Sequence, residues 1–273
     1  MKLLHEAMFP HESCFYEAEE HLEYGVKIKS IKCPLNTSRG NIFNLYLFIR
    51  DSWKLFAEIY LKLVNFIMKL DLYFITDSGF GRKHEDLAEI ALKAGIRIIQ
   101  FREKKMSTRN MFFTAKKIRK LTREYGATFI VNDRVDLALA VDADGVHIGQ
   151  DDLPVEAVRD IFNGIIGVST HNVEEAKNAE KYADYISAGP VFYTKTKRDA
   201  GKPIGIDGLR RIVESVRIPV VAIGGINREN ILDVLKTGVE GVAVISAIAC
   251  SKDPENAARE LLDIVLRFKK SRI

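Results

Sequence analysis

The chain has 273 residues, of which 47% are hydrophobic and 29% charged, and its formal net charge is +4. This composition excludes a disordered chain and a collagen-like repeat. The small net charge excludes a strongly polybasic nucleic-acid binder and allows an anionic small-molecule substrate. Three scattered cysteines are too few for a disulfide framework or a zinc site, which favours a reducing, cytoplasmic compartment.

Residues 1–67 differ in composition from the rest of the chain. They hold 11 of the 25 aromatic residues but only 2 of the 18 glycines, and their eight basic residues cancel eight acidic ones. We therefore predict a catalytic domain over 68–273 and an extension over 1–67. The extension is either a docked helix, poorly ordered sequence, upstream sequence from a non-native start, or a membrane-surface helix. Charges within 41–67 argue against a membrane span, and no secretory signal is recognisable.

From residue 68 onward, short apolar runs alternate with amphipathic stretches about every 25 residues. The apolar runs predict eight strands at Leu72–Thr76, Ile96–Phe101, Thr128–Asn132, Gly145–Gly149, Ile165–Thr170, Tyr185–Phe192, Pro219–Ile226 and Gly241–Ile248. The helical stretches between them include Asp86–Lys93, Thr108–Tyr125, Asn172–Lys181, Asn227–Lys236 and Pro254–Phe268. This alternation predicts an α/β fold, a closed (β/α)8 TIM barrel. The alternative is an open doubly wound sheet, which would usually carry a Gly-x-Gly-x-x-Gly turn that this sequence lacks.

Polar side chains stand at the predicted carboxyl ends of the strands, where barrel enzymes hold their active sites. The second strand ends in Gln100, Arg102 and Lys104, which alternate along the chain and therefore share one face. Their donors could form a fork for phosphate oxygens. The alternative is a solvated strand end whose basic residues pair with Glu103.

Two carboxylates follow neighbouring strands, Asp133 after the third and Asp152 after the fourth. Mg²⁺ is commonly held by one or two carboxylates together with substrate phosphates, so this pair predicts a magnesium site. The alternative is that Asp152 caps a helix that begins near Pro154.

Two histidines also lie near strand ends. His147 falls inside an apolar strand, where a histidine more often belongs to the core or supports another residue than binds a ligand. His171 and Ser169 follow the fifth strand at a more accessible place. No nucleophile elbow or Asp–His–Ser order accompanies them, so a hydrolase triad is unsupported.

The ends of the last three strands predict a second anion site. A polar loop over 189–205 could close over a substrate, and it carries Thr194, Thr196 and Lys197. The alternative for this loop is a mobile surface segment. Gly224 and Gly225 end the seventh strand, and a barrel commonly binds a phosphate with backbone N–H groups after its last two strands.

Taken together and in order, these motifs resemble the thiamine phosphate synthase family over residues 70–270. The matching segments are Gln100–Lys104, Asn132–Arg134, Asp144–Asp152, Gly167–His171, Gly189–Lys197 and the two terminal phosphate motifs. The resemblance implies a transferase that joins hydroxymethylpyrimidine diphosphate to thiazole phosphate and releases diphosphate. It also implies that Mg²⁺ assists the departure of the diphosphate.

The resemblance assigns roles residue by residue. The implied pyrimidine diphosphate contacts are Gln100, Arg102, Lys104, Asn132, Ser169 and Lys197, of which Arg102, Lys104 and Lys197 would act in catalysis. The implied thiazole phosphate contacts are Thr194, Lys195, Thr196, Gly225, Ile245 and Ser246. The implied Mg²⁺ ligands are Asp133 and Asp152.

Two other functions remain open from the sequence. A thiazole tautomerase would share the Gly-Gly-Ile site and the Ser-x-His motif, but that family generally lacks Asp133, Asp152 and the loop 194–197. A non-catalytic phosphate-binding barrel would bind ligand and form no product. The predicted partners are phosphorylated small molecules rather than nucleic acid or a membrane, and homo-oligomerisation stays open.

Overall fold

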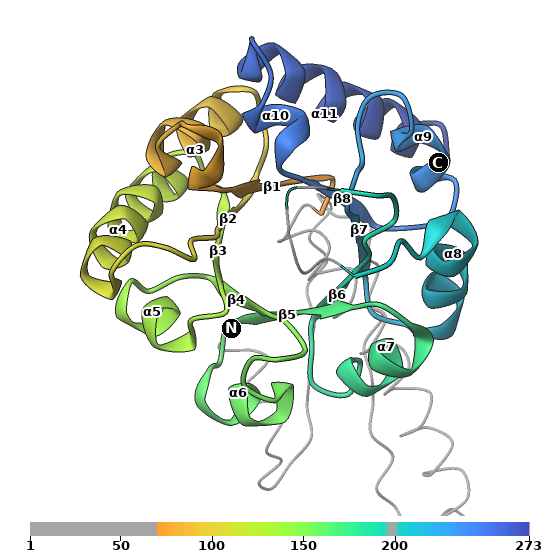
Figure 1. The fold of residues 1–273 in the computed structure, drawn as a ribbon, viewed down its shortest axis with the longest axis horizontal. Helices are drawn as coiled ribbons and strands as arrows, with labels where there is room; N and C mark the ends of the chain where they lie inside the picture. The colour runs from red at the N-terminus through yellow and green to blue at the C-terminus, as the bar shows by residue number, and fades with distance from the viewer. Residues whose placement is uncertain (1–69, 195, 197–200, 273) are drawn as a thin grey trace, which may run out of the picture. The chain divides into compact units, whose positions relative to one another are not determined.

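The computed structural model describes residues 70–194, 196 and 201–272 of the chain. The predicted extension over 1–67, together with Lys195 and Lys197, lies outside the described residues, so the division of the chain at residue 67 stays a prediction. The described part contains eight parallel strands in a closed barrel, each hydrogen-bonded to the next and β8 to β1 (Figure 1). This confirms the predicted α/β barrel and rejects the open sheet.

In the described part of the chain each strand is followed by a helix, with two helices after β8, and the helices surround the ring of strands (Figure 1). The strands are β1 Leu72–Thr76, β2 Ile98–Phe101, β3 Thr128–Asn132, β4 Gly145–Ile148, β5 Ile165–Thr170, β6 Tyr185–Ala188, β7 Val220–Ile223 and β8 Gly241–Val244. The helices are α3 His84–Lys93, α4 Thr108–Glu124, α5 Val135–Ala140, α6 Val155–Ile161, α7 Val173–Ala179, α8 Gly205–Ser215, α9 Ile231–Leu235, α10 Ser246–Ala249 and α11 Pro254–Lys270, with a 3-10 turn η1 at Ser78–Phe80. Among the described helices, none is long and apolar enough to cross a membrane.

The strands are buried on both faces, as their continuous apolar runs predict. One face packs against the helices in a large cluster that includes Phe74 and Phe129. The other face fills the barrel with a smaller cluster that contains Ile98, Ile130 and the two tyrosines Tyr73 and Tyr185. The barrel interior is therefore a packed core, and the open space lies above it.

Several strands end earlier than predicted because the backbone turns where the polar motifs begin. β6 ends at Ala188, since Pro190 has no N–H to continue a ladder. β7 ends at Ile223, because Gly224 and Gly225 take φ angles of 101° and 68°. β8 ends at Val244, and residues predicted as strand form α10 instead. The early ends leave the motif residues in loops at one rim of the barrel.

The opposite rim is held by ion pairs between helices and the residues just before strands. Arg119 of α4 binds Asp144 with two hydrogen bonds of 2.7 and 2.8 Å. Arg159 of α6 binds Asp184 at 2.7 Å. Each aspartate also accepts a 2.8 Å hydrogen bond from a backbone N–H of the preceding strand. This rim therefore serves the stability of the fold.

Candidate active site

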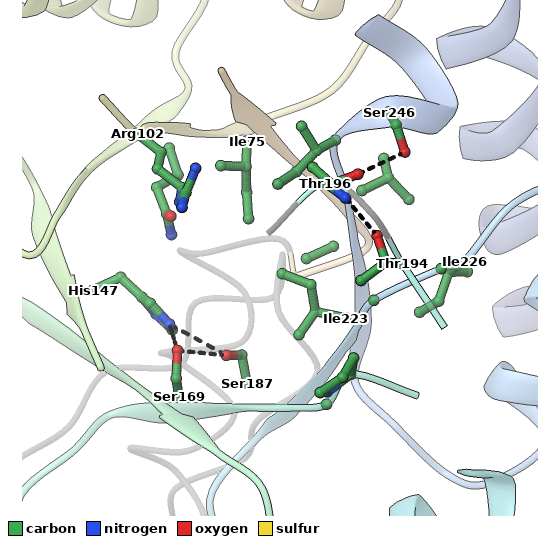
Figure 2. A pocket seen from close by; sticks show the side chains of 18 of the residues that line it. Ile75, Arg102, His147, Ser169, Ser187, Thr194, Thr196, Ile223, Ile226 and Ser246 are labelled. Carbon is green, nitrogen blue, oxygen red and sulfur yellow. Dashed lines mark hydrogen bonds between the residues drawn. The ribbon is translucent and has the colours of Figure 1, made fainter. Parts of the chain in front are cut away.

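A pocket lies at the carboxyl ends of the strands and brings together most of the predicted site residues. Its empty space, open solvent at the mouth included, is about 840 Å³. The predicted residues that line it are Gln100, Arg102, Asn132, Ser169, Thr194, Thr196, Gly225, Ile245 and Ser246. The pocket is also lined by residues that the sequence did not assign, among them Pro190. Four others are Ile75, Ser187, Ile223 and Ile226 (Figure 2).

Gln100 in β2 and Arg102 directly after it are held by partners from β1 and the turn after β1. Gln100 is buried and donates from Nε2 to the Tyr73 hydroxyl over 2.7 Å. Arg102 forms an ion pair with Asp77, whose other oxygen accepts from the Gly79 N–H over 2.8 Å. The ion pair thus orients the guanidinium, and the Arg102 side chain, 14% exposed, lines the pocket. The sequence-based alternative, in which the basic residues pair with Glu103, is wrong for Arg102.

Lys104, Asp133 and Asp152 form a charged group that does not line the pocket itself. The Lys104 ammonium forms an ion pair with Asp133. Asp133 has a φ of 59°, a left-handed conformation that is uncommon for a residue other than glycine and that clusters at functional sites. Burial raises the pKa of Asp152 above its ordinary value, and the neighbouring Asp133 raises this pKa further. Two carboxylates are therefore close enough to repel each other.

Asp152 does not cap the helix that follows it, so that alternative is wrong. The residue at the N-cap of α6 is Pro154, without a side-chain capping bond. Asp152 instead accepts a 2.7 Å hydrogen bond from the Gly149 N–H, which holds one oxygen at the end of β4. Among the described residues, no three His, Cys, Asp or Glu side chains gather as a metal site. A cation at the two aspartates would therefore need further ligands from substrate or water.

A buried polar chain runs beneath the pocket. The hydroxyls of Tyr73 and Tyr185 are 2.9 Å apart, and the His147 ring binds the Tyr185 hydroxyl through Nδ1 at 2.9 Å. His147 Nε2 lies 3.0 Å from the Ser169 hydroxyl and 3.2 Å from that of Ser187 (Figure 2). His147 thus lines the pocket and orients the two serine hydroxyls. Burial raises the pKa of both tyrosines, which keeps them protonated donors.

The last strands build a compact polar corner at the other predicted anion site. The Thr196 N–H donates to the Thr194 hydroxyl over 3.2 Å, and the Thr196 hydroxyl donates to Ser246 over 3.3 Å (Figure 2). Gly224 and Gly225 run so close to the loop after β6 that a side chain would not fit. A Cβ on Gly224 would lie 2.5 Å from Pro190, and one on Gly225 would lie 2.7 Å from the Tyr193 carbonyl oxygen. Close backbone approach and positive φ both explain the glycine pair.

Besides Ser187, the sequence missed the polar residues Asp77, Tyr73 and Tyr185 around this site. Asp77 directly follows an apolar strand, which is the same signal that identified Asp133, so it could have been found. Tyr73 and Tyr185 lie inside apolar strands 112 positions apart. Nothing in the local pattern distinguishes a core tyrosine from one that pairs across the barrel.

These observations define a barrel of the enzyme type, with a polar pocket at the carboxyl ends of its strands. A family model described as thiamine monophosphate synthase matches residues 72–248. A thiamine-phosphate synthase of Archaeoglobus fulgidus is 68% identical over 200 residues, covering 73% of this chain and 95% of the relative. One of Pyrococcus furiosus is 54% identical over 204 residues, covering 74% and 98%.

Solved structures agree with the sequence relatives. The structure of a thiamine phosphate pyrophosphorylase from Pyrococcus furiosus has a TM-score of 0.70 and 51% identity, and the match covers 75% of this chain and 99% of that one. The chain belongs to the thiamine monophosphate synthase family. The predicted family, the barrel and the predicted function as a transferase of thiamine biosynthesis are thereby confirmed.

Proposed function

We propose that this pocket joins hydroxymethylpyrimidine diphosphate to thiazole phosphate, giving thiamine phosphate and free diphosphate. One observation carries the proposal: residues from both predicted anion sites line the same pocket. Gln100 lies in β2 and Arg102 directly follows it, whereas Thr194, Thr196 and Ser246 follow β6 and β8. Two phosphorylated substrates bound at these places would meet within a single cavity.

The pyrimidine diphosphate half of the site would use the two cations that follow β2, Arg102 and Lys104. Arg102 and Lys104 each hold an aspartate in the described structure, so an incoming diphosphate can replace a carboxylate as their anionic partner. Gln100, Asn132 and Ser169 offer neutral donors and acceptors beside them for the pyrimidine ring. Lys197, which the sequence also assigns here, stays a prediction.

The thiazole phosphate half would use hydroxyls and backbone N–H groups. Support comes from the corner formed by Thr194, Thr196 and Ser246, whose hydroxyls already bond to one another or to the local backbone. Gly225 and Ile245 line the pocket beside them, where backbone N–H groups can approach a phosphate closely. Lys195 stays a prediction of the same kind.

The donor set at Asp133 and Asp152 fits Mg²⁺. The ion prefers one or two carboxylates together with substrate phosphates and water. The raised pKa of Asp152 reflects burial and the nearby Asp133, a pair of like charges that a divalent cation would relieve. When bound, Mg²⁺ would neutralise charge on the diphosphate leaving group.

The chemistry needs no nucleophile from the protein. The C–O bond to diphosphate breaks and its electron pair leaves with the diphosphate, while the aminopyrimidine delocalises the positive charge left on its methylene carbon. Arg102 and Lys104 would stabilise the charge that develops on the leaving group. The thiazole nitrogen then bonds to the methylene carbon. The pocket would orient the two substrates and stabilise the diphosphate leaving group.

The direct test incubates the full chain with both substrates and Mg²⁺ and measures thiamine phosphate and diphosphate. We expect stoichiometric formation of both products, and we expect Arg102→Ala to raise the KM for the pyrimidine diphosphate. Arg123→Ala is the matched control, because Arg123 pairs with Asp142 on the surface and lies outside the pocket. Binding without product would support a sensor, and thiazole isomerisation alone would support a tautomerase.

The proposed partners are the two phosphorylated substrates, without nucleic acid or membrane. We place the reaction in the cytoplasm, because scattered cysteines suit a reducing compartment. Gel filtration at assay concentration would decide whether a homo-oligomer forms.

A further inference from the structure

Glu103 stands between the two cations of the diphosphate site, but its side chain turns away from them. The residue is 8% exposed, and its side chain only 1%. Arg102 and Lys104 take Asp77 and Asp133 as their ion-pair partners. The Glu103 carboxylate therefore does not neutralise Arg102 or Lys104.

One oxygen of this carboxylate organises the loop between β2 and α4. Oε1 accepts hydrogen bonds from three consecutive backbone N–H groups: Lys104 at 2.7 Å, Lys105 at 2.5 Å and Met106 at 3.3 Å. A loop that leaves a strand usually has N–H groups without ladder partners. Here a single buried oxygen satisfies three of them and fixes the path of the chain directly after Arg102.

The second oxygen ties this loop to the loop after β1. Oε2 accepts from the Ser78 hydroxyl at 2.7 Å and lies 3.0 Å from His84 Nε2. His84 is fully buried, its Nδ1 lies 2.7 Å from the Thr76 hydroxyl, and its ring packs edge-on against Phe101 at 4.7 Å. The anchor is thus embedded in the core at the ends of β1 and β2.

The carboxylate stays ionised at neutral pH. Burial alone would raise its pKa, but the hydrogen bonds from Ser78, His84 and the Lys105 N–H outweigh burial and lower the pKa of Glu103 to about 2. An ionised carboxylate can only accept hydrogen bonds, so His84 carries its hydrogen on Nε2.

We propose that Glu103 is a positioning residue that holds the Lys104–Met106 backbone so that the Arg102 and Lys104 side chains face the diphosphate of the substrate. The proposal rests on the proposed function, because that function supplies the diphosphate. A shift of about 1 Å in a binding group can cost on the order of 100-fold in rate. An anchored loop avoids this cost by keeping both cations in place before substrate arrives.

The direction in which the KM for the pyrimidine diphosphate changes separates a positioning role for Glu103 from a purely electrostatic one. Glu103 carries a negative charge next to an anion site, so removing that charge alone would strengthen diphosphate binding. Removing the anchor would instead weaken binding, because the loop and its cations lose their fixed place. Glu103→Gln removes the charge but also weakens the anchor, because a neutral amide oxygen binds the three N–H groups less strongly. Its NH2 group cannot accept the hydrogen bonds from Ser78 and His84. Glu103→Ala removes the charge and the whole anchor.

The experiment measures KM for each substrate, kcat and urea unfolding for E103Q and E103A in the full chain. For E103A we expect kcat/KM for the pyrimidine diphosphate to fall about 10–100-fold. E103Q should show a smaller fall in the same direction, and the KM for thiazole phosphate should not change in either variant. Glu180→Gln is the matched control: Glu180 accepts a 2.5 Å hydrogen bond from the Arg217 N–H outside the pocket, and its kinetics should equal wild type.

An unchanged or lower KM for the pyrimidine diphosphate in E103Q overturns the proposal, and so does an equal rise in both KM values. If E103A does not fold, the direction of the change in this KM in E103Q decides by itself. Should the wild-type chain form no thiamine phosphate, the proposed function fails separately. Calorimetric titration with inorganic diphosphate and Mg²⁺ then tests Glu103 directly, with weaker binding expected for E103Q and equal or tighter binding overturning its role.

Discussion

Gly167→Ala should damage both the fold and the pocket, because a tyrosine and a histidine fill the space where a side chain would stand. Gly167 lies in the middle of β5. A Cβ there would lie 2.2 Å from Cζ of Tyr185 and 2.4 Å from Nδ1 of His147. Ordinary carbon contacts are about 3.5–4.0 Å, so the tyrosine ring would have to move by more than about 1 Å.

The ring has no free direction in which to move. Tyr185 is fully buried, and its hydroxyl bonds to Tyr73 and to His147, both at 2.9 Å. Overpacking a core costs about 1–3 kcal/mol, and a buried hydroxyl that loses its partner costs about 1–3 kcal/mol more. We expect a loss of about 2–6 kcal/mol in the free energy of unfolding, which lowers Tm by on the order of 10 °C in a domain of this size.

Urea unfolding and steady-state kinetics would measure the two effects together. A displaced His147 no longer orients the Ser169 hydroxyl, so kcat/KM for the pyrimidine diphosphate should fall by about tenfold or more. Gly126→Ala is the control, because Gly126 has a φ of 59° with nothing within 4 Å of an added Cβ. It should lose about 1 kcal/mol through backbone strain and keep its kinetics. Wild-type stability and kinetics in Gly167→Ala would refute this packing argument.

Four further outcomes are expected. Asp133→Ala should lose most Mg²⁺-dependent turnover while its circular dichroism stays native, and unchanged turnover at saturating Mg²⁺ would reject the metal assignment. Residues 68–273 expressed alone should match the specific activity of the full chain, and inactive or unfolded protein would show that 1–67 are required. Arg119→Ala should lose about 1–3 kcal/mol in urea unfolding without a change in either KM, because it leaves the partly buried Asp144 unpaired; an altered KM would contradict this. Because the folded pKa of Glu103, about 2, lies below its ordinary value of 4.5, its ionised form stabilises the fold above pH 4.5 and this contribution is lost as pH falls toward 2. The difference in unfolding free energy between wild type and Glu103→Gln should therefore shrink as pH falls from 4.5 toward 2. A constant difference would show that the ionised Glu103 carboxylate does not stabilise the fold.

The sequence predicted the barrel well because eight short apolar runs alternate with amphipathic stretches, and the Gly-x-Gly-x-x-Gly turn typical of an open doubly wound sheet is absent from the sequence. It also predicted Gln100, Arg102 and Asn132 as pocket residues, since polar side chains at the end of an apolar strand stand out. It did not predict which carboxylate faces which cation. Glu103 and Asp77 each follow the end of an apolar strand in the sequence, but only the closed barrel decides that Glu103 turns into the core and that Asp77 pairs with Arg102.

The same kind of ion pair has opposite roles at the two rims of this barrel. Asp144 and Asp184 precede strands, and each binds an arginine from a helix and a backbone N–H, so its hydrogen bonds are completed within the folded chain. Asp77 and Asp133 follow strands, and each holds a cation next to the pocket. An anionic substrate can compete for a cation at the second rim but does not reach the first. At the first rim, loss of one partner leaves a partly buried charge unpaired, which destabilises the fold. At the second rim, the carboxylate orients the cation, and an anionic substrate can take the place of the carboxylate. The position of an aspartate before or after its strand therefore decides whether its loss should first affect unfolding or substrate binding.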